Sequence, residues 1–353
     1  MAINGNILID KLRITFPIDT LSELSTTERT YIEKVRETLE QYYPATAYSI
    51  SSSRGEIKIT LTPTRFKPPH NFTYTDTNLE MPSEKWLLNL LLKLGFQNRR
   101  FSETARIVWI HLTKNVIMNE QVSLYKEFLS SYPFANGYKS ALISSSENNT
   151  TLRIATQKRN TERDDINGER TIIFYDKGQE LRDKANLDCI DLKEPLTKEE
   201  IVILKAHDVF YNRRFRKLDL YNLNLLRCEH QYQYREKIKP LARFLNNDTN
   251  DVLTVDVLIN LLAQRALYEK LNTFYIQQLK KIIFYKEPNV QEVQPFDSYQ
   301  RSFFNLLKNA DITELKLIYK TCGLSDKLDR NLKNFYKINS CDVYTELYQK
   351  LCR

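Results

Sequence analysis

The chain has 353 residues, of which 42% are hydrophobic and 27% charged, and its formal net charge is +8. This length and this apolar content are typical of a globular protein with one large or two modest domains, and they argue against wholesale disorder. No apolar run approaches the length of a membrane span, and five cysteines without C-x-x-C spacing indicate reduced thiols instead of a disulfide framework or a zinc site.

The first two thirds of the chain mix strand-like and helix-like segments. The N-terminal residues lack the basic and apolar pattern of a signal peptide, so we expect a cytoplasmic protein. Runs of β-branched and aromatic residues predict strands at Ile7–Phe16, Ala47–Ile50, Glu56–Thr62, Arg106–Val116, Ser140–Ser144, Thr151–Thr156, Thr171–Tyr175 and Leu225–Tyr234. Helical spacing predicts helices after Ser25 and at Glu84–Gly95, Asn119–Ser130 and Lys198–Tyr211.

Beyond about residue 240 the strand signal disappears. Helical spacing then recurs at Val255–Phe274, Ile276–Phe284, Tyr299–Lys308, Ile312–Lys320, Lys327–Tyr336 and Val343–Leu351. We therefore predict an α+β fold, with a mixed domain at residues 1–245 followed by an all-helical C-terminal domain at residues 246–353.

Several common catalytic motifs are missing. The sequence has no G-x-S-x-G, no G-x-x-x-x-G-K-[ST] and no G-x-G-x-x-G, and it contains only seven glycines. These absences argue against a hydrolytic serine triad and against a phosphate-cradling loop, so an ATPase is not expected. The net positive charge favours a polyanionic partner, although charge alone is a weak indicator.

Two polar residues interrupt strand-like runs. His111 shares a strand face with Trp109 and Thr113, and it is either a metal ligand or a buried histidine bonded to a neighbour. Glu229 lies in a run where carboxylates are seldom placed unless they are paired. It is either a metal ligand or the partner of Arg227 in a structural ion pair.

The segment TIIFYDKGQEL, Thr171–Leu181, ends an apolar strand with an unusual polar cluster. One interpretation is a hairpin end with a solvated rim. The other is a tyrosine nucleophile, because Tyr175 could attack a phosphodiester while Lys177 stabilises the phosphate. Such chemistry needs a divalent cation, which Glu180 together with an imidazole and a second carboxylate could hold.

Five segments resemble one protein family. YDKGQEL at Tyr175–Leu181 and LLRCEHQYQ at Leu225–Gln233 resemble the Y-x-K-x-x-E-L and L-x-R-x-E motifs of gene II and gene X type replication initiation proteins of filamentous phages and small plasmids. Further upstream, IDKLRITFPID, LTPTRFKPPHNF and VWIHLTKNV are similar to other segments of that family, in the same order. The resemblance covers much of residues 9 to 240.

The resemblance implies an antiparallel-sheet nuclease domain of the rolling-circle initiator type. Such proteins nick one DNA strand at the replication origin, stay attached to the 5′-phosphate through a tyrosine, and later rejoin the displaced strand. Carried over to this chain, it implies Tyr175 as the nucleophile and Lys177 as its assistant. Glu180 and Glu229 would be metal ligands or general bases, with Mg²⁺ or Mn²⁺ as the cofactor.

Two positions depart from the family pattern. His111 stands where the family strand has aspartate, which puts the choice of metal in doubt and leaves a weakened enzyme open. The strand TLRIATQKRN at Thr151–Asn160 lacks the aromatic and glycine residues of the family, so we expect no catalytic role for it.

Three segments are candidates for DNA contacts. A Pro-rich loop carries Arg65, Lys67 and Asn71, and the densest mixture of cations and aromatics carries Arg213, Arg214, Arg216 and Lys217. Residues 312–337 read as helix, glycine turn and helix, which fits a helix-turn-helix with Lys327, Arg330 and Lys333 facing DNA. A solvated basic helix end and a helix pair that binds nothing remain the alternatives.

These observations predict a rolling-circle replication initiator, a metal-dependent nickase and strand transferase. Its expected partners are double-stranded origin DNA, the displaced single strand and a host helicase and polymerase, with homodimerisation left open. The main alternative is a DNA-binding regulator with lost or reduced activity on the same scaffold. A structural protein of a filamentous particle is disfavoured by the charge and by the polar residues within strands.

Overall fold

A computed structural model of the chain describes residues 7–43, 45–64, 83–132, 134–146, 149–156, 170–180, 224–233, 235–285, 312–324, 328 and 343–352. Its strands are β1 (Leu8–Pro17), β2 (Tyr48–Ser53), β3 (Glu56–Leu61), β4 (Arg106–Ile117), β5 (Tyr138–Ser146), β6 (Asn149–Thr156), β7 (Arg170–Asp176) and β8 (Leu225–Gln233). The main helices are α1 (Glu28–Tyr42), α2 (Glu84–Leu91), α3 (Arg99–Thr104), α4 (Val122–Ser131), α8 (Arg235–Leu245), α9 (Val255–Ala263), α10 (Leu267–Ile282) and α12 (Ile312–Thr321).

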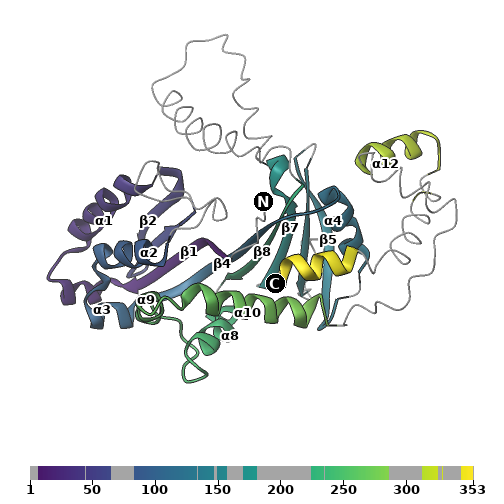
Figure 1. Ribbon diagram of the computed structural model, residues 1–353. Coiled ribbons are helices and arrows are strands. Elements are labelled where there is room, and N and C mark those ends of the chain that lie inside the picture. The colour runs from purple at the N-terminus through teal and green to yellow at the C-terminus, as the bar shows by residue number, and fades with distance from the viewer. Residues whose placement is uncertain are drawn as a thin grey trace, which may run out of the picture.

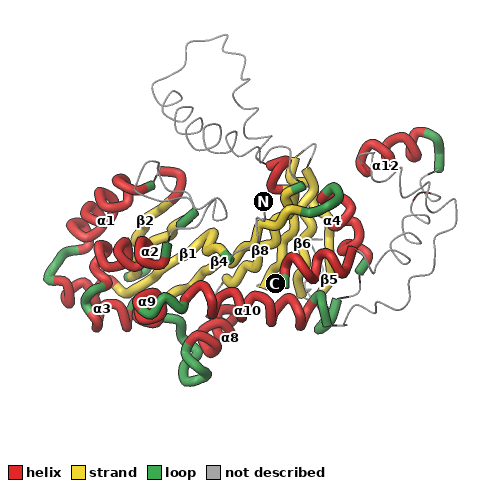
Figure 2. The backbone as a smooth tube through the Cα atoms, viewed as in Figure 1, coloured by secondary structure: helices red, strands yellow, loops and turns green. Residues whose placement is uncertain are grey.

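One eight-stranded sheet runs through the molecule in the order β2-β3-β1-β4-β8-β7-β6-β5 (Figure 2). Every neighbouring pair is antiparallel. Strand β8 lies between β4 and β7 even though residues 177–224 separate it from β7 in the sequence. The prediction of an α+β fold is confirmed, and the sheet is antiparallel.

Alternation along the central strands gives the sheet two unlike faces. On β1, Leu12, Ile14 and Phe16 are buried, whereas Lys11 and Arg13, on either side of Leu12, are only half-buried. The first set forms an apolar face that must be covered, and the second belongs to a polar face. We use these two names below.

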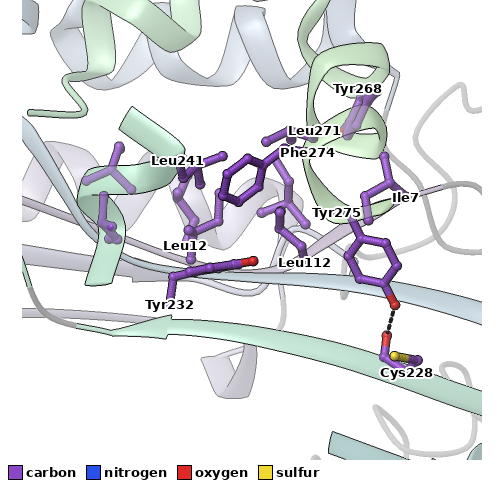
Figure 3. Close-up of a cluster of buried hydrophobic side chains, with 14 of the residues drawn as sticks. Ile7, Leu12, Leu112, Cys228, Tyr232, Leu241, Tyr268, Leu271, Phe274 and Tyr275 are labelled. Carbon is purple, nitrogen blue, oxygen red and sulfur yellow. Dashed lines mark hydrogen bonds between the residues drawn. The ribbon is translucent and has the colours of Figure 1, made fainter. Parts of the chain in front are cut away.

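Helices cover the apolar face. The ring of Phe16 lies 5.6 Å from that of Tyr31 on α1 and 4.8 Å from that of Phe101 on α3. Farther along the sheet, Phe274 of α10 packs among Leu12 and other sheet residues, and the Tyr275 hydroxyl donates to the carbonyl of Cys228 at 2.9 Å (Figure 3). Figure 1 shows α10 running along this part of the sheet.

Among the described residues after 245 the elements are helices, joined by turns, and the one strand-like feature is an isolated bridge between Thr254 and Arg106. Their buried side chains nevertheless belong to the same core as the strands, since Leu258, Phe274 and Leu347 join that cluster. The separate all-helical domain predicted for residues 246–353 is therefore not confirmed. The helices predicted at Tyr299–Lys308 and, apart from Leu328, at Lys327–Tyr336 lie outside the described residues. None of the described helices is long and apolar enough to cross a membrane.

The predicted helix-turn-helix is described only in its first half. Helix α12 is present, and Gly323 follows it with a φ of +68°, a conformation that favours glycine in a turn. The second helix of the motif, with Lys327, Arg330 and Lys333, lies outside the described residues.

A buried lysine joins the apolar face to the last helix, residues 343–351. Lys114 of β4 is 1% exposed, and its Nζ donates to the carbonyl of Leu351 at 3.1 Å. Burial lowers the pKa of Lys114 to about 8. The helix is also held by Lys350, whose Nζ donates to the carbonyl of Ile117 at 2.6 Å.

The depressed pKa of Lys114 makes the stability of the fold depend on pH. Between about pH 8 and the ordinary lysine pKa of about 10.4, the unfolded chain binds a proton that the folded chain does not, so stability rises with pH. Relative to Lys114→Met, the wild type should gain up to about 1.4 kcal/mol per pH unit across this window. Urea unfolding of both proteins at pH 7, 8 and 9 checks this, and a difference that stays constant with pH would contradict it.

Candidate functional site

Three side chains from three adjacent strands meet on the polar face. Asp10 of β1, His111 of β4 and Glu229 of β8 place their potential ligand atoms within 4.8 Å of one another. His111 is 5% exposed and Glu229 is 6% exposed, so these polar groups sit largely out of water. We call them the Asp-His-Glu cluster.

A bulge in β1 brings Asp10 into this cluster. Ile9 pairs with Leu112 and Lys11 pairs with His111, so Asp10 is the extra residue that has no partner in the register. Bulges bend a strand locally and re-aim a side chain, and they occur often beside active sites. The bulge therefore explains how Asp10 and Lys11, which are consecutive residues, both lie near His111.

Hydrogen bonds on both ring nitrogens fix the tautomer of His111. The indole N–H of Trp109 donates to Nε2, and an indole nitrogen can only donate, so Nε2 carries the lone pair. In the neutral ring the proton is then on Nδ1, which lies 2.7 Å from Oε1 of Glu229 and donates to it. This arrangement agrees with the predicted sharing of one strand face by His111 and Trp109.

Glu229 is held as a carboxylate. Burial alone would raise its pKa, but hydrogen bonds from His111 and Gln231 and the nearby charge of Arg227 outweigh burial and lower it. The amide of Gln231 donates to Oε1 of Glu229 at 2.7 Å. A charged carboxylate at this position is what cation binding requires.

Arg227 connects the cluster to Tyr175. It is 4% exposed, and its Nη1 lies 3.2 Å from the Tyr175 hydroxyl and 3.4 Å from Oδ1 of Asp10. Its Nε donates to the side chain of Asn115 at 2.8 Å, which fixes the guanidinium in place. Strands β7 and β8 bring the two residues together because Tyr175 and Arg227 are partners in their register.

The phenol of Tyr175 is protonated at neutral pH. Burial raises its pKa well above the ordinary value of 10, and the charge of Arg227 offsets only part of that increase. Deprotonation would thus have to accompany any nucleophilic attack by this oxygen. Arg227, whose Nη1 lies 3.2 Å from the hydroxyl, could compensate the resulting negative charge.

Lys177 and Glu180 lie on a short helical turn, residues 177–180, directly after β7. Asp176 caps this turn, since its Oδ1 accepts from the backbone N–H of Gln179 at 2.8 Å. Nζ of Lys177 lies 2.9 Å from Oε2 of Glu180. The polar end of TIIFYDKGQEL is therefore an ion-paired turn placed beside Tyr175.

Of the residues predicted for the site, the structure brings His111 and Glu229 together, and Tyr175 reaches them through Arg227. Glu180 pairs with Lys177 and is not one of the three clustered residues, so its role as a metal ligand stays a prediction. The predicted DNA contacts lie outside the described residues: Arg65, Lys67, Asn71, Arg213, Arg214, Arg216, Lys217, Lys327, Arg330 and Lys333.

Two residues of the site were not predicted. Asp10 is a carboxylate inside the strand-like run ILIDKLRITF, which is the same signal that drew attention to Glu229. For Arg227, pairing with Glu229 was one of two alternatives. Its charge does act on Glu229, and it also contacts Tyr175, Asp10 and Asn115, which the sequence did not indicate.

The donor set of the cluster suits Mg²⁺ or Mn²⁺. The two carboxylates offer oxygen ligands for a hard cation, and His111 could add a nitrogen ligand of the kind that Mn²⁺ accepts only by giving up one of its two ring contacts. Comparison with known proteins gives no independent identification, since no family model, no curated protein and no solved structure matches the chain.

Proposed function

We propose that this protein is a rolling-circle replication initiator that nicks one strand of origin DNA with Tyr175 and later rejoins it. The observation that carries the proposal is the position of Arg227. One guanidinium nitrogen contacts both the Tyr175 hydroxyl and Asp10 of the Asp-His-Glu cluster. A nucleophile, a compensating cation and a cation-binding cluster thus adjoin one another.

In the proposed reaction, the phenol oxygen of Tyr175 attacks the scissile phosphorus. A phosphotyrosine bond forms, the bond to the 3′ oxygen breaks, and the chain stays attached to the 5′ end of the nicked strand. Because one ester replaces another, a free 3′ hydroxyl can later reverse the exchange and close the strand. The phenol loses its proton as the new bond forms, and the departing 3′ oxygen takes up a proton to leave as a hydroxyl, so the step is balanced. Arg227 would hold the phenol oxygen in position and balance its charge as the proton leaves.

Asp10, His111 and Glu229 would hold the cation. When bound, Mg²⁺ or Mn²⁺ supplies charge neutralisation on the phosphate oxygens. Lys177, buried beside Tyr175, remains the expected further contact to the phosphate. The partners in this proposal are double-stranded origin DNA and the displaced strand.

A nicking assay tests the proposal directly. Supercoiled DNA with the cognate origin is incubated with the protein and Mn²⁺ or Mg²⁺, and the products are separated under denaturing conditions. We expect a nicked circle with protein attached at the 5′ end. If the protein binds the origin but produces no nick with any cation tried, the proposal that it is a nicking enzyme is rejected.

The hydrogen bond from Trp109 gives specific support to the alternative, a DNA-binding regulator with lost activity. The indole N–H occupies the Nε2 lone pair, and the Nδ1 proton points at Glu229, so His111 offers no free nitrogen in this arrangement. A cation could bind to His111 only if Trp109 changed its contact. The regulator, by contrast, would keep the contact unchanged.

Fluorescence of Trp109 should separate these two functions. The chain has two tryptophans, so Trp86→Phe leaves Trp109 as the only one. Trp86 packs against Tyr42 and Tyr43 on another part of the fold, so replacing it should leave the surroundings of Trp109 unchanged. We expect Mg²⁺ to change the Trp109 emission and Mn²⁺, which is paramagnetic, to quench it strongly.

The same titration on a protein that also carries Glu229→Gln is the control, and it should show neither effect. If Trp109 emission in the parent protein stays constant up to millimolar Mn²⁺, no cation binds beside His111. That result would favour the regulator.

A further inference from the structure

A cavity of about 340 Å³ opens on the sheet at some distance from the Asp-His-Glu cluster. Strands β1, β3 and β4 and the segment between α8 and α9 form its walls. Apolar side chains line part of it, including Val108, Ile238 and Leu253, and cations line another part, including Arg13, Lys58 and Arg106. This volume lies at the lower end of the range for small-ligand pockets.

The charged groups at this cavity are only partly neutralised. Asp251 is paired with Lys239 at 3.5 Å, and Lys58 donates to the hydroxyl of Ser53 at 3.1 Å. Arg106 and Glu56 are exposed, and neither side chain has a partner among the residues that the structure describes. The cavity thus combines an apolar wall with an excess of positive charge and one free carboxylate.

A row of cations links the cavity to the Asp-His-Glu cluster. Trp109 lies between them on β4, with Nζ of Lys11 at 4.7 Å and the guanidinium carbon of Arg13 at 4.1 Å from its ring centroid. Cation–π contacts of this kind hold both charges over the ring. Lys11 pairs with His111 in the register, and Arg13 pairs with Trp109, so the row leads from the cluster to the cavity.

We infer that the cavity and this row of cations bind single-stranded DNA next to the scissile phosphate, with one nucleotide seated in the cavity. The inference rests on the proposed function. Single-strand binding sites combine a positively charged path for the phosphates with apolar or aromatic surfaces for the bases, and both occur here along two strands. The free carboxylate of Glu56 and the guanidinium of Arg106 can bond to the edge of a base or to its phosphate.

The spacing agrees with a short stretch of nucleic acid. Arg13 is three positions after Asp10 on β1, which corresponds to about 10 Å along a strand. At roughly 3.4 Å per nucleotide along a stacked strand, this is the span of about three nucleotides, and an extended strand needs fewer. The seated nucleotide would therefore lie within about three positions of the nick.

Binding of a fluorescein-labelled dT12 oligonucleotide tests this inference without any nicking. Fluorescence anisotropy is measured in EDTA at several salt concentrations, for the wild type, for Arg106→Ala and for Lys58→Ala. We expect each substitution to weaken binding about 5- to 10-fold at low salt and to reduce the slope of log K against log salt by about 0.7, because each removes one phosphate contact.

Arg29→Ala is the matched control. It removes the same charge from an exposed arginine on α1, which is ion-paired with Glu33 at 3.0 Å, and it should leave dT12 binding unchanged. If Arg106→Ala and Lys58→Ala behave like Arg29→Ala, the cavity does not bind DNA and the inference is overturned.

Nicking by the wild type distinguishes this failure from failure of the proposed function. A protein that nicks origin DNA but binds dT12 independently of Arg106 and Lys58 would retain its proposed function and lose only the cavity assignment. A protein that never nicks but binds dT12 through both cations would retain the cavity as a nucleic-acid site.

Discussion

Tyr175→Phe should abolish nicking and the covalent attachment of the protein to DNA. The substitution removes the one oxygen that the proposed mechanism uses as a nucleophile and keeps the ring. Loss of a nucleophile commonly costs several orders of magnitude in rate, so we expect nicking to fall by at least about 10³-fold. Denaturing gels of a 3′-labelled origin strand measure this loss, because the protein attached to the new 5′ end retards the labelled fragment.

The control for Tyr175→Phe is a second buried tyrosine far from the site. Tyr31 on α1 donates its hydroxyl to the carbonyl of Leu94 at 2.8 Å, so Tyr31→Phe removes a hydrogen-bonded phenol oxygen elsewhere in the fold and should leave nicking intact. Since the chain has 21 tyrosines, another could in principle carry the DNA. If Tyr175→Phe still forms the covalent adduct with DNA, another tyrosine is the nucleophile.

Glu229→Gln should remove the cation from the site. The amide keeps the shape of the side chain but loses the charge and the strong acceptor that His111 and Gln231 now contact. We expect Mn²⁺ affinity to fall by at least about 100-fold, more than is usual for loss of a supporting residue, and nicking to fall with it. Calorimetric titration measures the affinity, and thermal unfolding shows whether the variant is folded.

Two further carboxylates make this experiment discriminating. Asp10→Asn should act like Glu229→Gln, because both oxygens belong to the cluster. Glu180→Gln should keep most of the cation affinity, because Glu180 is paired with Lys177. If Glu180→Gln loses as much affinity as Glu229→Gln, then Glu180 is a ligand as the sequence suggested. If Glu229→Gln binds Mn²⁺ normally, the cluster is not the cation site.

The sequence predicts the polar face of the sheet correctly where side chains alternate regularly along a strand. Strand alternation correctly grouped His111 with Trp109 and Glu229 with Arg227, because period-two patterns hold along an undistorted strand. The same logic fails at Asp10. A bulge shifts the alternation by one residue, and nothing in ILIDKLRITF reveals where the bulge falls.

Strand order was equally hard to predict. β8 inserts between β4 and β7, and only this order places Arg227 beside both Tyr175 and Asn115. A sequence gives strand positions but little information on which distant strands pair. The contacts of Arg227 were therefore not predicted, because its partners Tyr175, Asn115 and Asp10 lie 52, 112 and 217 positions away.

For the helices after residue 245, the sequence indicated their presence but not the surface against which they pack. Its periodicity predicted helices in the described part of this region, although the break falls at residues 264–266 and not after Phe274. Periodicity does not tell which surface an apolar stripe covers. Here buried residues of α9 and α10 join the core of the sheet, so the described residues on both sides of the predicted boundary share one core.

The anchoring of residues 343–351 has a consequence for synthesis on the ribosome. Lys114 finds its carbonyl partner, Leu351, only after 237 further residues have been synthesised. Until then the apolar face around Leu112 lacks part of its cover, and such surfaces are prone to aggregate. We therefore expect ribosome-bound nascent chains to be protease-sensitive until residues 343–351 have emerged and packed.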